Sequence, residues 1–511
     1  MELQRRSNVK PFNFSPSKFW EGNDGLWSTF LLRVGTPAQT FRVLISTMNQ
    51  EIWVPLVGSC ELSEPKNCAD LRGIQPFQNA ASPGFQTNKS STWNFINLYG
   101  LAFEEVWQGY SENGMYGFDT VGLQIQNSGG VTRDHQIVAG IVTKDFLHGI
   151  FSLGPKPTNF SDFNDSQPSY LWSLKNQSLI PSLSYAYSAG AFYANRSLGT
   201  LTLGGYDASQ MKEKELDWMF HVDSSSNLEV GLQVIVASDT FEGKQTSLLL
   251  NGITAYIDST YPKIWLPLDA CEAFEKAFGL NYDPTSFRYL INTTTHARLQ
   301  SLNPTITFKI GNSTFGGLTR NIVFPYAAFD LQASYPIFEN DTRYFPIRRA
   351  DNSSHYTIGR VFLQEAYLVV VYGRRRFAMH QRSFGGNDEQ NLVQISDPDS
   401  RLSSSRLGSG PIAGVVVGVI LTFALLGWLY LRHRKWRQLK KILGRKPGAI
   451  EIVDDADAVE HNQTSTMELP NNAYFEAGGR VTAHEVDVRQ SILVESGGRE
   501  IEAELAVIGY R

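Results

Sequence analysis

One segment of the chain occurs twice. FRVLISTMNQEIWVP, at residues 41–55, aligns with ITAYIDSTYPKIWLP, at residues 253–267, when Ser46 is placed over Asp258. Isoleucine, tryptophan and proline residues then match around these two positions, which are 212 residues apart. A repeat of this kind predicts two related halves, with a boundary near residues 200–215. It also raises the question of why one copy carries serine and the other aspartate.

Residues 25–385 are predicted to be all-β. Short apolar runs rich in Val, Ile, Phe, Tyr and Thr, such as YLVVVYG, alternate with clusters of Gly, Asn, Pro and Ser, which is typical of strands joined by turns. LDACEAFEKAFGL has apolar residues at helical spacing and is the clearest predicted helix. Because 511 residues exceed one ordinary core, we predict an N-terminal lobe at 25–205 and a C-terminal lobe at 206–385, preceded by a segment at 1–24.

A stretch near the C-terminus has the composition of a membrane-spanning helix. PIAGVVVGVILTFALLGWLYL, residues 411–431, contains no charged residue in 21. At about 1.5 Å rise per residue it would cross the roughly 30 Å hydrocarbon core of a membrane. Eight lysine and arginine residues follow within fifteen positions, so the positive-inside rule places the C-terminal side in the cytoplasm. We predict a single-pass protein, anchored by a helix at 410–431, with its ectodomain outside the cell or in the lumen of the secretory pathway or vacuole.

The segments next to this predicted helix are polar. Residues 386–409 are rich in serine and are predicted to form a stalk. Residues 432–511 begin with the basic cluster, and from 447 on they carry thirteen Asp and Glu against four Lys and Arg; we predict a disordered cytoplasmic tail. The first 24 residues lack the apolar stretch of a signal peptide, so we expect the coding sequence to begin further upstream.

Asn-x-Ser/Thr sequons are concentrated before the predicted membrane helix. Ten precede it and one, Asn462, follows it. This distribution predicts a glycosylated ectodomain. The ten asparagines are Asn13, Asn88, Asn159, Asn164, Asn176, Asn195, Asn292, Asn312, Asn340 and Asn352.

Cysteine, histidine and net charge narrow the possible chemistry. Of three cysteines, Cys60 and Cys68 close a short loop and are the predicted disulfide pair if the compartment is oxidising, whereas Cys271, in the predicted helix, is expected to be a buried free thiol. The nine histidines are scattered and never paired at ligand spacing, so no metal or organic cofactor is predicted. The net charge of −5 gives no reason to expect nucleic acid as a partner.

Five blocks of the sequence resemble the pepsin-like aspartic peptidases. RVGTPAQTFRVLISTMNQEIWVP is similar to the family's first active-site block and AYIDSTYPKIWLP to the second. GIFSLGP (149–155), LTLGGYD (201–207) and a C-terminal block at 356–379 fall in the family's order. The resemblance covers residues 25–385 and implies a bilobal β-fold in which one loop from each lobe meets at the floor of a long cleft that binds an extended peptide. With its predicted anchor and tail, the chain also resembles a group of fungal surface proteins.

The chemistry implied by this resemblance needs two carboxylates. Two carboxylates in contact share a proton, so that one acts as general base on a water molecule while the other polarises a carbonyl. In this chain the first aspartate is replaced by Ser46, and only the second, Asp258, is retained. Thr47 and Ser259 keep hydroxyl groups where the family's loops hold each other across the lobes. Four neighbouring positions depart from the family's glycine and hydroxyl residues: Met48, Thr260, Asn49 and Tyr261.

Two further features of the family have no clear counterpart. Glu51 is the nearest other acid in sequence, but Lys263 occupies its position in the repeat, which suggests a solvent-facing slot. We therefore do not expect Glu51 to replace the missing carboxylate. The flap tyrosine that covers substrate in the family has no match at the right spacing, and Tyr99 and Tyr110 are the candidates.

Three functions are compatible with these residues. The first is a catalytically inactive, membrane-anchored homologue whose cleft binds an extended polypeptide or another surface ligand. The second is an active, atypical aspartic endopeptidase that uses Asp258. The third is a structural or adhesive surface glycoprotein with a vestigial cleft. A floor blocked by Met48 and Tyr261 would favour the third function, and an open cleft with apolar pockets would favour the first.

Overall fold

The structure is a computed structural model that describes most of the predicted ectodomain. The described residues are 9–101, 113–160, 165–213, 215–217, 220–222, 225, 227–384, 390–396, 426, 428, 430, 432 and 434. The chain divides into two compact units, residues 1–414 and 415–511, and every strand described belongs to the first. No helix within the described residues is long and apolar enough to span a membrane. The predicted span at 410–431 and tail at 432–511 lie almost wholly outside those residues, as do Tyr110 and Asn164.

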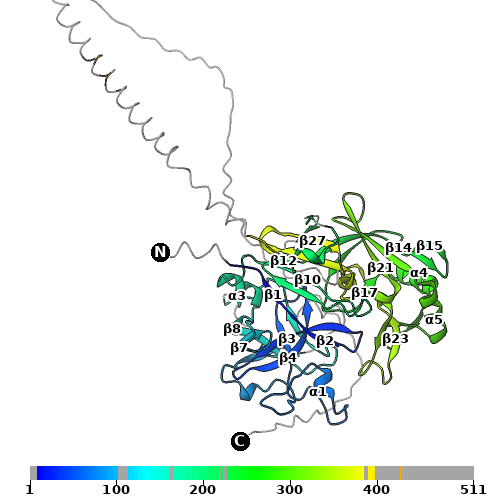
Figure 1. Cartoon of the computed structure of the whole chain (residues 1–511), viewed down its shortest axis with the longest axis horizontal. Helices are drawn as coiled ribbons and strands as arrows, with labels where there is room; N and C mark the ends of the chain where they lie inside the picture. Colours follow the sequence, from blue (N-terminus) through cyan, green and yellow to red (C-terminus); the bar gives the residue numbers. More distant parts are fainter. Residues whose placement is uncertain are drawn as a thin grey trace, which may run out of the picture. The chain divides into compact units, whose positions relative to one another are not determined.

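An eight-stranded sheet forms most of the N-terminal half, drawn in blue and cyan in Figure 1. Its strands, in spatial order, are β2 (Pro16–Glu21), β3 (Trp27–Val34), β4 (Gln39–Ser46), β9 (Gly149–Ser152), β5 (Ile52–Pro55), β8 (Thr132–Ile141), β7 (Asn113–Leu123) and β6 (Asn94–Gly100). The central strands β9 and β5 are buried at every residue, and β4 at all but one. Their nearly continuous apolar sequences follow from that burial on both faces.

A second eight-stranded sheet forms the core of the C-terminal half, drawn mainly in green in Figure 1. Its strands are β21 (Thr319–Pro325), β20 (Thr305–Gly311), β14 (Glu229–Thr240), β16 (Ile253–Ile257), β25 (Thr357–Ile358), β17 (Ile264–Leu266) and β24 (Ile347–Arg349), with β15 (Gly243–Ser247) beside β14. A four-stranded sheet lies in the same half: β18 (Asn281–Asp283), β19 (Arg288–Leu290), β23 (Thr342–Phe345) and β22 (Leu331–Ala333).

The strands around the repeated segment are paired in the same way in both halves. β4 runs parallel to β9, and β16 runs parallel to β25. β5 and β17 each make one antiparallel bridge, from Trp53 to Ile150 and from Trp265 to Thr357. β5 is also parallel to β8, and β17 to β24. The repeat predicted from the sequence is therefore a duplication of the structure.

A six-stranded sheet joins the two halves. Its strands are β1 (Phe12–Phe14), β11 (Thr200–Leu203), β10 (Ser184–Ser188), β26 (Ala366–Val371), β27 (Arg376–Gln381) and β13 (Phe220–His221). β10 of the first half pairs directly with β26 of the second. The backbone hydrogen bonds of one sheet thus fix the two lobes to each other.

The structure moves two predicted boundaries. Residues 12–21, which we placed before the N-terminal lobe, form β1 and β2 of that lobe. Residues 392–394, which we placed in the stalk, form β28 (Leu392–Gln394) and pair with β12 (Gly205–Asp207). Ile395 is then buried against the core. Main-chain pairing, which a polar composition does not reveal, holds this segment on the lobe.

Among the described residues up to 396, helices are few and lie between strands. The α-helices are α1 (Cys68–Leu71), α3 (Tyr170–Asn176), α4 (Leu268–Phe278) and α5 (Thr293–Leu302), and the 3₁₀ turns are η2 (Thr87–Lys89), η3 (Ala208–Gln210), η4 (Tyr326–Phe329), η5 (Ser353–His355), η6 (Phe362–Gln364) and η7 (Tyr372–Arg374). The predicted helix at 268–278 is confirmed as α4. It ends at Gly279, whose φ of 63° suits glycine. Its buried face includes Cys271 and Phe274.

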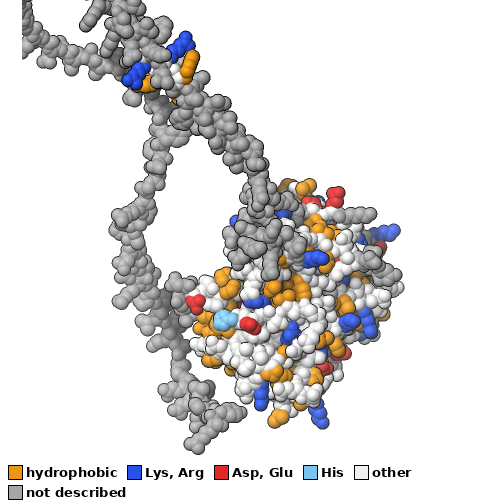
Figure 2. All heavy atoms as spheres, turned by 60° about the vertical axis from the view of Figure 1, so that its left-hand side comes forward, with side chains coloured by type: hydrophobic (Ala, Val, Ile, Leu, Met, Phe, Trp, Pro, Cys, Tyr) orange, Lys and Arg blue, Asp and Glu red, His pale blue; other side chains and the backbone are white. Residues whose placement is uncertain are grey.

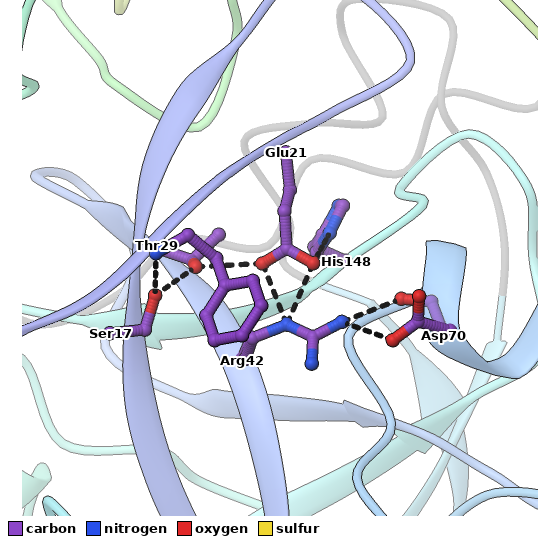
Figure 3. A network of polar contacts seen from close by, with 7 residues as sticks. Ser17, Glu21, Thr29, Arg42, Asp70 and His148 are labelled. Carbon is purple, nitrogen blue, oxygen red and sulfur yellow. Dashed lines mark hydrogen bonds and ion pairs between the residues drawn. The ribbon is translucent and has the colours of Figure 1, made fainter. Parts of the chain in front are cut away.

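A polar network, buried at Arg42 and exposed at Asp70, ties β2 and α1 to β4 (Figure 3). Arg42 Nε donates to Glu21 Oε1 at 2.7 Å, and Arg42 Nη2 donates to Asp70 Oδ1 at 2.8 Å. Thr29 Oγ1 donates to Glu21 Oε2 at 2.8 Å. Burial and the nearby positive charge of Arg42 lower the pKa of His148 to about 3. His148 is therefore neutral, and its 4.0 Å approach to Glu21 is not an ion pair.

The surface is mixed in character. On the face drawn in Figure 2, hydrophobic, basic and acidic side chains are interspersed among neutral polar ones. Large hydrophobic side chains are nonetheless exposed at single loop positions, such as Leu62 and Phe315. A mixture of this kind is what a folded globular domain presents to water.

Candidate functional site

The loops that follow β4 and β16 meet and bind each other. Thr47 N donates to Ser259 Oγ at 3.1 Å, and Ser259 N donates to Thr47 Oγ1 at 3.0 Å. The two hydroxyls also donate across the lobes, Thr47 to the carbonyl of Ile257 at 3.0 Å and Ser259 to the carbonyl of Ile45 at 2.6 Å. All four bonds are buried. The sequence prediction placed these two hydroxyls at the contact between the lobes, which is where the structure has them.

Ser46 lies at the end of β4 with no exposed surface. Its Oγ accepts hydrogen bonds from Asn49 N at 2.9 Å and from Met48 N at 3.3 Å. Thr260 Oγ1, from the opposite loop, donates to it at 2.7 Å. The serine oxygen therefore receives hydrogen bonds from both lobes.

Asp258 lies at the matching position of the second loop and is 4% exposed. Its Oδ1 accepts a hydrogen bond from Thr260 N at 2.9 Å, and its backbone N donates to Ile358 O at 3.0 Å. The pKa of Tyr185, nearby, is raised well above its usual value by burial first and then by neighbouring groups that include Tyr372 and Asp258. The structure thus brings Asp258 and Ser46 to the same place, with Thr260 bonded to both.

The residues that depart from the family's glycines adopt ordinary backbone angles. Neither Met48 nor Thr260 has a positive φ, so no glycine-like conformation is imposed on them. Tyr261 is buried and packs edge-on against Trp265, with ring centroids 5.9 Å apart. Asn49 uses its Oδ1 to accept from Gln50 N at 2.8 Å. The loop is rebuilt around larger side chains without backbone strain at these positions.

Glu51 and Lys263 were predicted to face solvent, and the structure shows that this prediction is wrong. Glu51 is 6% exposed and Lys263 3% exposed. Tyr116 and Thr158 donate from their hydroxyls to the Glu51 carboxylate at 2.5 and 3.2 Å. Alternation along a strand failed here because both residues lie next to β5 and β17, which are buried on both faces. Glu51 is held in a structural role within the N-terminal lobe.

Of the two flap candidates, Tyr99 is described and lies on β6. Its ring packs against Phe160 at 5.1 Å and against Tyr116 at 5.9 Å between centroids. Because Tyr116 also holds Glu51, the β6–β7 hairpin is linked to the loop after β4 through this aromatic cluster.

A pocket of about 630 Å³ lies beside the site and is lined by both halves. Leu44 and Ile150 contribute from β4 and β9, two strands that end at the first loop. Thr260, Tyr261 and Lys263 contribute from the second loop. The space next to the two loops is therefore open and only partly apolar. A blocked floor would have favoured a structural or adhesive protein, and an open cleft with apolar pockets would have favoured ligand binding. The observed pocket lies between these two cases.

Two residues of this region were missed by the sequence reasoning. Arg360, 2% exposed, donates from Nε to Ser259 O and from Nη2 to Thr260 O, both at 2.9 Å. Arg360 directly follows Ile358 and Gly359, which cross behind the second loop. This position in the sequence could have indicated that Arg360 contacts the loop. Lys263 was noted only as the counterpart of Glu51, although a lysine in an otherwise apolar segment is itself unusual.

Lys263 is expected to reduce the stability of the fold. Burial first, and then Arg288 and Arg348, lower its pKa well below the usual 10.5. Between the lowered value and 10.5 the unfolded chain binds more protons than the folded one, so stability rises with pH through this window. Lys263→Met should therefore raise the free energy of unfolding by about 1–2 kcal/mol at neutral pH, and the gain should shrink as the pH approaches 10.5. Urea unfolding from pH 6 to 10 measures this, and a gain that grows with pH would contradict it.

The remaining predicted positions lie away from the site. Cys60 and Cys68 form the predicted disulfide, and Cys271 is a buried free thiol whose pKa is raised to about 12, mainly by burial. Because both sulfurs of the Cys60–Glu64–Cys68 group are in the disulfide, that group is not a metal site. Among the described sequon asparagines, Asn13 is half-buried and eight are exposed: Asn88, Asn159, Asn176, Asn195, Asn292, Asn312, Asn340 and Asn352.

Two β-lobes with a duplicated loop, joined by a shared sheet, are the architecture expected of a pepsin-like aspartic peptidase. The chain matches the eukaryotic aspartyl protease family over residues 30–380 and belongs to that family. Secreted aspartic protease 1 of Candida albicans is 28% identical over 249 residues, which cover 48% of this chain and 56% of the relative. Pepsin B of Canis lupus familiaris is 24% identical over 355 residues (66% and 77%), and aspartic proteinase yapsin-3 of Saccharomyces cerevisiae is 23% identical over 429 residues (78% and 73%). The chain thus spans little more than half the length of the Candida relative.

Proposed function

We propose that this chain is a catalytically inactive, membrane-anchored member of the aspartyl protease family that binds an extended polypeptide beside its former active site. One observation carries the proposal: the position of the first catalytic aspartate holds the Ser46 hydroxyl, whose oxygen accepts hydrogen bonds from Met48, Asn49 and Thr260.

The reason is the acid–base chemistry of the site. A serine hydroxyl does not ionise in the accessible pH range, so it cannot share a proton with Asp258 in the way that a second carboxylate would. Asp258 alone could act on a water molecule as a base, but it lacks the acid that polarises the carbonyl. The loss of one member of such a pair lowers the rate by several powers of ten.

The binding part of the proposal rests on what remains around the site. The reciprocal bonds between Thr47 and Ser259 support a fixed arrangement of the lobes. The adjoining pocket, of about 630 Å³, is in the size range of sites that enclose ligands. The two loops are still held together, but the pair of carboxylates is incomplete because Ser46 replaces the first aspartate. This combination favours binding over cleavage.

The membrane part rests on the sequence. The uncharged stretch at 411–431 and the basic cluster after it favour a single crossing, with the folded lobes outside and the tail in the cytoplasm. Eight exposed sequon asparagines are compatible with a glycosylated surface on the same side. Basic residues after the span would also be attracted to anionic lipids, by about 1 kcal/mol each.

The experiment is a search for cleavage and binding with the full chain, purified in detergent. A diverse library of octapeptides is incubated with the wild type and with Asp258→Asn from pH 3 to 7. We expect no cleavage by either protein at any pH, and retention of a subset of peptides by both. Circular dichroism verifies that both proteins are folded.

The outcomes separate the alternatives. Cleavage by the wild type that disappears in Asp258→Asn would make the chain an active, one-carboxylate endopeptidase and overturn the proposal. Cleavage that is equal in both proteins indicates a contaminating protease and calls for its removal before the comparison is repeated. Neither cleavage nor peptide retention would leave the structural or adhesive function and would also overturn the proposal.

A further inference from the structure

The pocket beside the site is lined by five lysine and arginine side chains and by three aspartates. Four of its basic side chains form no ion pair with any residue in the described parts of the chain: Lys263, Arg288, Arg348 and Arg360. A fifth, Lys144, is already paired with Glu64 at 3.0 Å. The charge of the four is therefore not balanced by an ion-pair partner within the lobes.

Lys263 is buried and faces the pocket. Its side chain is 3% exposed, lines the pocket, and makes no hydrogen bond or ion pair with the described residues. Arg288 and Arg348 are close enough for their charges to oppose its protonation. A buried amine without a partner is costly for a fold, unless something outside the fold supplies the partner.

The acidic residues of the lining are committed elsewhere. Asp24 accepts a hydrogen bond from Trp27 Nε1 at 2.6 Å, and its negative charge favours protonation of Lys263 without forming an ion pair with it. Asp283 accepts from Ser286 Oγ at 2.5 Å and from Thr285 N at 3.2 Å within its own turn. Asp145 is exposed at the rim. None of these forms an ion pair with Lys263.

Arg348 and Arg288 are held in place by contacts with aromatic rings and a backbone carbonyl, and these contacts do not pair their charges with a carboxylate. The Arg348 guanidinium lies over the Trp265 ring at 3.9 Å and over Phe287 at 5.2 Å. Arg288 Nη1 donates to the carbonyl of Ser286 at 2.8 Å, but its Nε has no partner in the described residues. Positioned cations of this kind need little reorganisation to receive an anion.

We propose that this pocket is a subsite for an acidic side chain, so that the groove selects extended peptides that carry aspartate or glutamate. A carboxylate placed there meets Lys263 directly and offsets the mutual repulsion of Lys263, Arg288 and Arg348. A basic side chain would instead meet like charges in a partly desolvated pocket, which opposes its binding. This inference rests on the proposed peptide-binding function and adds the class of ligand to it.

The test compares two octapeptides that differ only by Glu and Gln. The parent sequence is the peptide best retained by the full chain in the library above, and binding is measured by fluorescence polarisation. We expect the Glu peptide to bind at least about tenfold more tightly than its Gln counterpart, because a desolvated charge pair is lost in the latter. In Lys263→Met the two peptides should bind within about threefold of each other.

Two further variants complete the design. Lys244→Met removes the same charge from the exposed strand β15, away from the pocket, and should leave the Glu preference unchanged. Arg348→Gln provides a second, independent change inside the pocket, and it should also weaken the preference. A loss of preference caused equally by Lys244→Met would indicate general charge attraction and overturn the inference.

The outcomes also distinguish this inference from the function on which it rests. If peptides bind but Glu and Gln forms bind equally in the wild type, the acidic subsite is wrong and the peptide-binding function stands. If no peptide binds, both fail together. A Glu preference that persists in Lys263→Met and in Arg348→Gln would place the recognition elsewhere and overturn the assignment of this pocket.

Discussion

Arg42→Met is expected to lower the free energy of unfolding by about 3–5 kcal/mol. The Arg42 side chain is 3% exposed and lies between Glu21, which is 13% exposed, and Asp70. Removing the guanidinium leaves the Glu21 carboxylate buried without its cation, and such an uncompensated charge is among the largest costs of a single substitution. Methionine retains most of the side-chain length, so the change in packing is small. Urea unfolding at pH 7 measures the loss.

The pH dependence of this loss identifies its cause. Burial already raises the pKa of Glu21 above its usual 4.5, despite the nearby Arg42, so the folded state binds the extra proton more readily than the unfolded one. Stability from this group is therefore present below 4.5 and falls as pH rises through the folded-state value. In Arg42→Met the destabilisation should be smaller near pH 4 than at pH 7. A loss that is the same at both pH values would instead indicate packing alone.

Two variants serve as controls for the Arg42 prediction. Arg376→Met removes an arginine from the exposed first position of β27, where it makes no ion pair with the described residues, and should change stability by less than about 0.5 kcal/mol. Glu21→Gln in the Arg42→Met background removes the unpaired charge, so the double variant should be more stable than Arg42→Met alone.

The duplicated architecture could be predicted because the sequence repeats the residues that define it. Trp53 and Trp265 occupy equivalent bridges to the strand behind each loop. Ser46 is the last residue of β4, and Asp258 directly follows the equivalent strand β16. Thr47 and Ser259 could be placed at the lobe contact because the resemblance to the aspartic peptidases implies hydroxyls at these two positions, where the family's loops hold each other. Local pattern and tertiary structure agree at these positions.

Other features depend on contacts between distant segments and were not predictable from local patterns. The burial of Glu51 is set by Tyr116 and Thr158, which lie 65 and 107 residues away. Strand β28 is formed by a polar segment that pairs with β12, nearly 190 residues earlier in the sequence. Thr260 donates a hydrogen bond across the lobes to Ser46. The glycine that the family resemblance implies at position 260 has no side chain to make this bond. In each case the role of the residue follows from the three-dimensional structure and not from the local sequence.

The site combines a stable frame with unsatisfied groups next to it. The Thr47–Ser259 contact satisfies four buried polar groups, whereas Lys263 a few residues further on has no partner in the described residues. Natural proteins often retain such local costs where a function needs them. The contrast is the physical reason for our proposal that ligand recognition, and not catalysis, takes place beside this pair of loops.

The second large effect is expected at the contact between the two loops. Ser259→Ala removes the hydroxyl that accepts from Thr47 N and donates to the carbonyl of Ile45. Each buried group left without a partner costs about 1–3 kcal/mol, so the variant should lose about 2–5 kcal/mol. Thr47→Val, nearly the same in shape, removes the bonds to Ser259 N and Ile257 O and should lose a similar amount. Ser301→Ala, at an exposed position on α5, is the matched control and should change little.

Combining the two substitutions tests whether the loops act as one unit. Because each hydroxyl accepts from the backbone of the other's residue, the bonds form a closed pair across the lobes. Once the first substitution has loosened that pair, the second has less to disrupt, so the double variant should lose less than the sum of the single losses by at least about 0.5 kcal/mol. A double-mutant cycle by urea unfolding measures this coupling. Strictly additive losses would mean that the two hydroxyls stabilise their own lobes independently, and the lobes would then be held together by the shared six-stranded sheet alone.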